Sequence, residues 1–252
     1  MGNSNGKQPR LTRKEKQTLE AEQRAAMQGL GAALQAVATT SKLDLTKSQR
    51  TLGNHIKTYD LTFVTGAAGS GKTTGVLAEY VSQYLSDKTK QIIVIRTPVE
   101  AGSDKVGFLP DDLSAKMEPH FVSARDVLNT LLGREKVTCD MNKRIFFKIP
   151  NYCLGSTWDN ALVLIDEAQQ IQPMIMKLLL ERAGKNTKIV VAGDPTQLYV
   201  EDKTRNGLTH ARAKFIVDGE SKYPNVSSFD FPLEDSKTRS DLAYTVVHAY
   251  NS

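Results

Sequence analysis

The sequence predicts an α/β domain in which a mostly parallel sheet carries helices on both faces. Short runs of apolar and β-branched residues alternate with amphipathic segments, and most of these runs are continuously apolar. Strands with that pattern are buried on both sides, which is typical of parallel sheets covered by helices. In chain order, the predicted strands are residues 61–65, 91–96, 162–165 and 188–192.

The segments between these strands predict helices. One begins at Lys72, a second covers 113–132 and a third covers 173–183, because their apolar residues recur at helical spacing. Residues 144–149 alternate between apolar and polar and predict either an edge strand or a hairpin. The polar residues 133–143 predict the turn before it.

Residues 1–45 predict a basic arm with an amphipathic helix, and residues 46–252 predict the α/β domain. Thr12 and Glu15 match a capping box, and apolar residues recur at helical spacing as far as Val37. The first 50 residues hold nine Lys+Arg and four Asp+Glu, whereas the remainder holds 24 of each. The arm either contacts nucleic-acid phosphates or is a solubilising tail, and its charge leaves both readings open.

The composition of the 252-residue chain, with 40% hydrophobic and 24% charged residues, is that of a soluble globular protein. No apolar run approaches the roughly 20 residues of a membrane span, and no apolar stretch of a signal peptide follows the polar start. We therefore expect a cytoplasmic protein without membrane contact. Cys139 and Cys153 form no CxxC motif and no cluster with histidines, which favours neither disulfides nor a zinc site.

The strongest chemical signal is a glycine-rich segment between the first strand and the helix that begins at Lys72. It fits the pattern G-x-x-x-x-G-K-[ST], in which backbone N–H groups curl around phosphates at conformations that a Cβ would obstruct. Lys72 is expected to reach the β- and γ-phosphates, while the helix N-terminus favours their negative charge. The expected nucleotide-binding residues are Gly66, Ala67, Ala68, Gly69, Ser70, Gly71, Lys72, Thr73 and Thr74.

An apolar strand that ends in two acids, Asp166 and Glu167, complements this loop. Thr73 and Asp166 are expected to hold Mg²⁺ beside the phosphates of ATP. Glu167 has the opposite strand parity, and we expect it to polarise a water for attack on the γ-phosphate. This second acid favours hydrolysis over phosphoryl transfer by a small-molecule kinase. The alternative for the pair is a solvated strand end.

The last predicted strand runs into residues 193–197, which read Gly-Asp-Pro-Thr-Gln. Ligands of open parallel sheets lie beyond the carboxyl ends of the strands, so this segment, Asp166 and the phosphate loop should border one crevice. Gln197 is expected to reach the γ-phosphate or the attacking water. A simple Gly-Asp-Pro turn would explain the first three residues but not the last two.

These motifs and three further segments resemble the PhoH-like proteins, phosphate-starvation-inducible ATPases of bacteria and phages. The resemblance implies a RecA-like P-loop core similar to the first motor domain of superfamily 1 helicases. It also implies ATP hydrolysis and action on RNA or single-stranded DNA. It covers nearly everything after the N-terminal arm and depends on residues 96–102, 106–113, 116–119, 164–169 and 193–197.

The resemblance gives roles to two residues outside the phosphate loop. Gln49 is similar to a glutamine that reads adenine in such motors, because an amide offers a donor and an acceptor to one base edge. The alternative is a surface glutamine at a helix start. Arg239 matches an arginine before the last helix of the family, where a guanidinium would stabilise charge on the γ-phosphate. The alternative here is an ordinary arginine at a helix start.

One departure from the family concerns residues 152–158, which lack the two arginines that we expect around Gly155. If those arginines contact nucleic acid or an adjacent subunit in relatives, the contact is weakened or moved here. Arg96 is then the best candidate for a nucleic-acid or phosphate contact. Trp158 and Phe108 either stack on bases or pack in the core, and core packing is the favoured reading.

The sequence supports two functions of different classes. The first is an Mg²⁺-dependent ATPase coupled to RNA or single-stranded DNA. A strand-separating motor needs two such domains, so we expect a homo-oligomer, such as a hexameric ring, in which Arg239 of one copy completes a neighbouring site. The second is an ATP-switched binding module with slow hydrolysis that recruits protein partners. The missing arginines favour this module, whereas Glu167 and Gln197 count against it.

Overall fold

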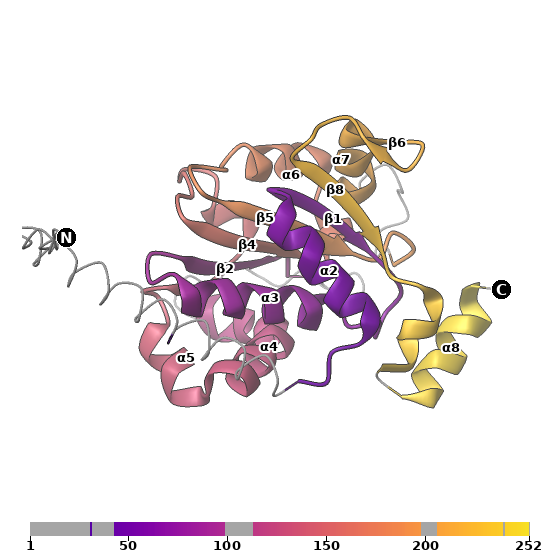
Figure 1. The fold of residues 1–252 in the computed structure, drawn as a ribbon, viewed down its shortest axis with the longest axis horizontal. Coiled ribbons are helices and arrows are strands. Elements are labelled where there is room, and N and C mark those ends of the chain that lie inside the picture. Colours follow the sequence, from indigo (N-terminus) through magenta and orange to yellow (C-terminus); the bar gives the residue numbers. More distant parts are fainter. Residues whose placement is uncertain (1–30, 32–42, 99–112, 198–205, 239, 252) are drawn as a thin grey trace, which may run out of the picture.

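The computed structural model describes residues 31, 43–98, 113–197, 206–238 and 240–251. Its centre is a six-stranded sheet with the strand order β3-β2-β4-β5-β1-β8, in which every pairing is parallel (Figure 1). The predicted α/β fold class, with a mostly parallel sheet and helices on both faces, is confirmed. The sheet consists of β1 (Leu61–Thr65), β2 (Gln91–Arg96), β3 (Ile145–Lys148), β4 (Ala161–Asp166), β5 (Lys188–Gly193) and β8 (Val226–Asp230).

Helices cover both faces of this sheet, with α2, α3 and α4 on one side and α6 and α7 on the other (Figure 1). Apart from Gly31, the predicted N-terminal helix lies outside the described residues, and so do Phe108 and Arg239. A short antiparallel hairpin of β6 (Ile216–Val217) and β7 (Glu220–Ser221) follows α7. The α-helices are α2 (Lys47–Thr58), α3 (Lys72–Ser86), α4 (Leu113–Leu132), α5 (Arg134–Asp140), α6 (Pro173–Leu180), α7 (Gly207–Phe215) and α8 (Asp241–Asn251).

The central strands are buried on both faces, which explains their continuous apolar pattern. Ile92 and Val94 of β2 lie in the core cluster that includes residues of α2, α3 and α4. Ile93 and Ile95 lie in the cluster with α6 and α7, because successive side chains of a strand point to opposite faces. Trp158 belongs to this second cluster and is only 2% exposed, so the core-packing alternative is confirmed for this residue.

Three segments differ from the predictions. The turn predicted at 133–143 is wrong, because Arg134–Asp140 forms helix α5 with Val137 buried in the core. Helix α6 ends at Leu180, before the predicted end of the segment. The sequence does not predict β8, because Ser227 and Ser228 interrupt its apolar pattern.

The C-terminal segment lies to one side of the sheet. Helix α8 packs mainly against the 3-10 segment η5 (Leu233–Thr238) and projects from the body of the domain (Figure 1). Among the described residues, no helix combines the length and the apolar character needed to cross a membrane.

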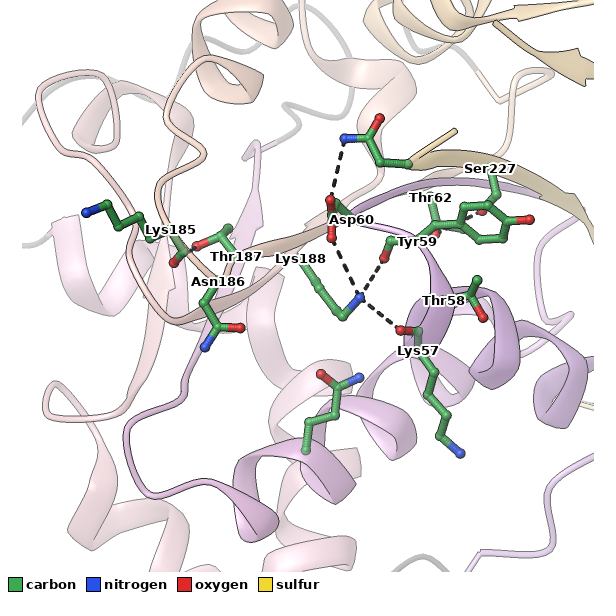
Figure 2. Close-up of polar contacts among 12 residues, drawn as sticks. Lys57, Thr58, Tyr59, Asp60, Thr62, Lys185, Asn186, Thr187, Lys188 and Ser227 are labelled. Carbon is green, nitrogen blue, oxygen red and sulfur yellow. Dashed lines mark hydrogen bonds and ion pairs between the residues drawn. The ribbon is translucent and has the colours of Figure 1, made fainter. Parts of the chain in front are cut away.

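Lys188, the first residue of β5, forms hydrogen bonds with backbone carbonyls at the C-terminal end of α2 (Figure 2). Its Nζ donates hydrogen bonds to the carbonyl oxygens of Lys57 at 3.0 Å and Tyr59 at 2.9 Å, and the Asp60 carboxylate lies 3.9 Å away. The last carbonyls of a helix lack partners within it, so a cation there satisfies them and interacts favourably with the helix dipole. This contact fixes α2 at the amino ends of the strands, opposite the phosphate loop.

We expect Lys188→Met to lower the free energy of unfolding by about 1–2 kcal/mol, because the carbonyls at the end of α2 lose a charged donor. Urea unfolding followed by circular dichroism measures this change. The exposed Lys185 precedes the same strand and provides the matched control. Lys185→Met should alter the free energy by no more than about 0.5 kcal/mol. Equal losses in the two variants would contradict an anchoring role for Lys188.

Candidate nucleotide-binding site

The phosphate loop joins the carboxyl end of β1 to the first turn of α3. Gly71 precedes α3 with a φ of 82°, a left-handed conformation that residues with a Cβ adopt only at a cost. A Cβ at this position would also lie 2.3 Å from Nε2 of Gln49. Ser70 is fully buried, and its Oγ has no hydrogen-bond partner among the described residues. Such an orphaned hydroxyl is unusual in a native interior and marks the loop as a polar site with unused bonding capacity.

Lys72 lies within the curve of this loop. Its Nζ donates hydrogen bonds to the carbonyl oxygens of Gly66 at 2.7 Å and Ala67 at 2.9 Å. Burial lowers the pKa of Lys72, whereas the negative charges of Asp194, Glu167 and Asp166 act in the opposite direction. The side chain therefore brings one positive charge into a group of three acids at the carboxyl edge of the sheet.

Thr73 and Asp166 meet as the sequence predicts for a cation site. The Thr73 hydroxyl lies 3.2 Å and 3.3 Å from the two carboxylate oxygens of Asp166. Asp166 is only 3% exposed, and burial together with the neighbouring Glu167 raises its pKa, while Arg96 and Lys72 oppose that shift. A hydroxyl and a carboxylate are hard oxygen ligands, so this pair fits Mg²⁺ chemically.

Glu167 follows β4 with a φ of 50°. Its Oε1 lies 3.4 Å from Nη2 of Arg96, and its Oε2 accepts a hydrogen bond from Gln169 Nε2 at 2.7 Å. Arg96 stands opposite Asp166 in the register of β2 and β4, and its Nη1 lies 3.8 Å from Asp166 Oδ2. The structure thus pairs Arg96 with both acids, and its contact with nucleic acid stays a prediction.

Gln49 is buried against the phosphate loop, with 4% of its surface exposed. Its Nε2 donates to the Gly71 carbonyl at 3.1 Å, and its Oε1 accepts from the backbone N–H of Thr46 at 2.9 Å in the capping box of α2. An amide has two donor hydrogens and two acceptor lone pairs, so each end retains one further bond. Recognition of adenine by Gln49 stays a prediction, and the structure adds a loop contact that the sequence pattern does not reveal.

The remaining predicted residues lie at or beyond the same edge of the sheet. Gln197 is on the turn after β5, where its backbone carbonyl accepts a hydrogen bond from Gln170 Nε2 at 2.8 Å. Its contact with a γ-phosphate stays a prediction. Arg239 is outside the described residues, so the structure gives it no position.

Sequence reasoning did not identify the ionic contact that supports the start of the loop. Thr65, the last residue of β1, donates a hydrogen bond to Asp230 at the end of β8. Arg212 of α7 donates to the other oxygen of Asp230 at 2.8 Å and to Ser228 Oγ at 2.9 Å. No motif signals this cluster, because it depends on the pairing of β1 with the polar strand β8.

A family model described as PhoH-like protein matches residues 43–251 of the chain. The PhoH-like protein of Bacillus subtilis (strain 168) is 36% identical over 207 residues, which cover 82% of this chain and 63% of that relative. Protein PhoH of Escherichia coli (strain K12) is 34% identical over 200 residues, which cover 78% of this chain and 54% of that relative. The chain therefore spans 54–63% of the length of these two relatives.

Solved structures provide more distant similarities. The Sulfolobus solfataricus SWI2/SNF2 ATPase core in complex with dsDNA matches with a TM-score of 0.40 and 14% identity, covering 75% of this chain and 45% of that chain. Unliganded Pif1 from Bacteroides sp. matches with a TM-score of 0.29 and 18% identity, covering 75% and 42%. Similarities at this level support no argument about fold or function.

We expect Gly71→Ala to lower the free energy of unfolding by about 1–2 kcal/mol, because a Cβ there is disfavoured by the left-handed backbone and displaces the Gln49 amide. Chemical denaturation measures the change. Gly155→Ala is the matched control, because a Cβ at Gly155 would have no heavy atom of the described residues within 4 Å. The control should stay within about 0.5 kcal/mol of the unmutated protein. A Gly71 variant as stable as the control would contradict the close packing of Gln49 against Gly71.

Proposed function

The chain belongs to the PhoH-like protein family, and from this premise we propose that it is an Mg²⁺-dependent ATPase whose turnover is coupled to RNA or single-stranded DNA. One observation carries the ATPase proposal: the Thr73 hydroxyl contacts the Asp166 carboxylate next to the loop that encloses Lys72. This arrangement combines a phosphate-binding cradle with hard ligands for a cation. Hydrolysis of a nucleoside triphosphate requires both.

Each residue of the site has a distinct part in the proposed reaction. The loop N–H groups and Lys72 bind and orient the phosphates. Thr73 and Asp166 would hold Mg²⁺, which would supply positive charge next to the phosphates. Glu167 orients the attacking water and accepts its proton. Gln197 contacts the γ-phosphate or that water.

Coupling to nucleic acid rests on the family and on charge. Within the first 50 residues, Lys and Arg exceed Asp and Glu by nine to four, and such an excess adds phosphate contacts that weaken as salt increases. The missing arginines at 152–158 leave this arm and Arg96 as the candidate contacts. We propose RNA or single-stranded DNA as the partner.

The proposed active form is a homo-oligomer, such as a hexameric ring. Arg239 of one copy would stabilise the charge that develops on the γ-phosphate in the site of the next copy. A neighbouring domain that closes over the nucleotide would also exclude water from the reaction.

An ATP-switched binding module is the second candidate. It is favoured by the pairing of Arg96 with both Asp166 and Glu167, since a cation that occupies the acids would slow hydrolysis. In that case the nucleotide-bound form would recruit a protein partner, and phosphate release would not control its function.

Steady-state phosphate release from ATP, with and without single-stranded RNA, distinguishes the two candidates. We expect release to depend on Mg²⁺, to increase with RNA, and to fall at least about 100-fold in Glu167→Gln, because the water loses its general base. The variant should still bind ATP. Glu220→Gln, at an exposed position in β7, is the matched control and should retain full activity. Release by the unmutated protein at the rate of Glu167→Gln would favour the switch.

Mixing two inactive variants tests the shared site. Arg239→Ala and Glu167→Gln should each lack activity, for different reasons. In a mixed oligomer, a Glu167→Gln copy can supply Arg239 to the intact acid site of an Arg239→Ala copy, so part of the activity should return. The measurement is phosphate release as a function of mixing ratio. Mixtures that stay inactive although the copies exchange would indicate that Arg239 acts within its own chain.

A further inference from the structure

Gln169 is a buried amide that joins the carboxyl ends of β4 and β5. It lies on the 3-10 segment η3 (Ala168–Gln170), and 1% of its surface is exposed. Its Nε2 donates to Glu167 Oε2 at 2.7 Å, while its Oε1 accepts from the backbone N–H of Asp194 at 3.1 Å. Both ends of the amide are therefore occupied by groups of the candidate site.

The chemistry of its neighbours determines the orientation of this amide. A backbone N–H can only donate, so the atom that faces Asp194 is the oxygen. A carboxylate accepts, so the atom that faces Glu167 is the nitrogen. Rotation of the amide by 180° would place its NH₂ group against the Asp194 N–H and its oxygen against the Glu167 carboxylate. Only the observed orientation of the Gln169 amide therefore satisfies both hydrogen bonds.

The backbone of Glu167 has an unfavourable conformation, with a φ of 50°, which contacts with neighbouring groups must stabilise. Among the described residues with positive φ, Glu167 is the one that is not glycine, asparagine or aspartate. A long side chain gains no local compensation in the left-handed region, and such conformations persist where the surroundings determine them several times over. The hydrogen bond from Gln169 spans only two residues and acts directly on this carboxylate.

Gly193, the last residue of β5, leaves the space that Gln169 occupies. A Cβ at Gly193 would lie 2.2 Å from Oε1 of Gln169 and 3.2 Å from the backbone nitrogen of Ala168. The absence of that Cβ lets the amide reach the N–H of Asp194. The turn that carries Gln197 is thereby connected to the acid at the end of β4.

We propose that Gln169 is a positioning residue for Glu167, which it holds in the orientation needed to act on the attacking water, and that it links this orientation to the turn at 194–197. This inference rests on the proposed ATPase function and adds a residue to it. Gln169 does not touch the nucleotide or the water in this role. It acts through the Glu167 carboxylate, so its removal should change turnover and leave nucleotide binding as it was.

The test is a double-mutant cycle with Gln169→Met and Glu167→Gln. Methionine has a similar length and no amide. We expect Gln169→Met to lower kcat about 10- to 100-fold, because a small misplacement of a catalytic group is costly. The Kd for a slowly hydrolysed ATP analogue should stay within about twofold, since no phosphate ligand is altered. In the Glu167→Gln background, the same substitution should cause no further loss of turnover, because residues that act as a unit are not additive.

Two further variants separate positioning from general stability. Gln169→Glu retains an acceptor for the Asp194 N–H but places a carboxylate opposite Glu167, so kcat should fall as in Gln169→Met. Gln91→Met is the matched control, because Gln91 donates to the Asp159 carbonyl at 3.0 Å at the amino end of β2, far from the acids. It should leave kcat unchanged. Full activity of Gln169→Glu, or a loss of turnover that adds to that of Glu167→Gln, would overturn the proposal.

A failure of the proposed function gives a different result. An unmutated protein that releases no phosphate contradicts the ATPase proposal. Thermal unfolding of the unmutated protein, Gln169→Met, Glu167→Gln and the double variant then decides the positioning role. A decrease in Tm in the double variant that is smaller than the sum of the two single decreases would support direct coupling. Additive shifts would show that Gln169 does not act on Glu167.

Discussion

The candidate site is organised around a carboxylate that is buried at the end of an apolar strand. Asp166 closes β4, all of whose residues are buried, and its burial raises its pKa. An isolated charge in such a place is costly unless other groups compensate for it. The compensation comes from Arg96 on β2 and from Lys72 and Thr73 on α3. Arg96 and Lys72 favour the charged form of Asp166. The charged carboxylate is also the form that binds a cation.

The two acids at the end of β4 are held by different means. Asp166 continues the strand, whereas Glu167 turns into the left-handed region and so presents its carboxylate in a new direction. Arg96 contacts both acids, and Gln169 contacts only the second. One strand end thus supplies two carboxylates whose surroundings are distinct enough for separate chemical roles.

Much of the fold and part of the site follow from the sequence, because they depend on local pattern. The bounds of β1 and β2 agree with their apolar runs, and the meeting of Thr73 with Asp166 follows from the rule that parallel strands end at one edge. The position of Arg96 depends on strand register, which places it opposite Asp166 and which no local pattern reveals. Gln169 is equally hidden, because a buried glutamine has no sequence signature until its two partners are in place.

Helix α2 connects the two ends of the domain. Gln49 in its first turn is bonded to Gly71 in the phosphate loop, and the carbonyls at its other end are bonded to Lys188. A helix of 12 residues is about 18 Å long and nearly rigid. Helix α2 therefore connects the phosphate loop mechanically to the amino ends of the strands, because each of its two ends is bonded to a different edge of the sheet.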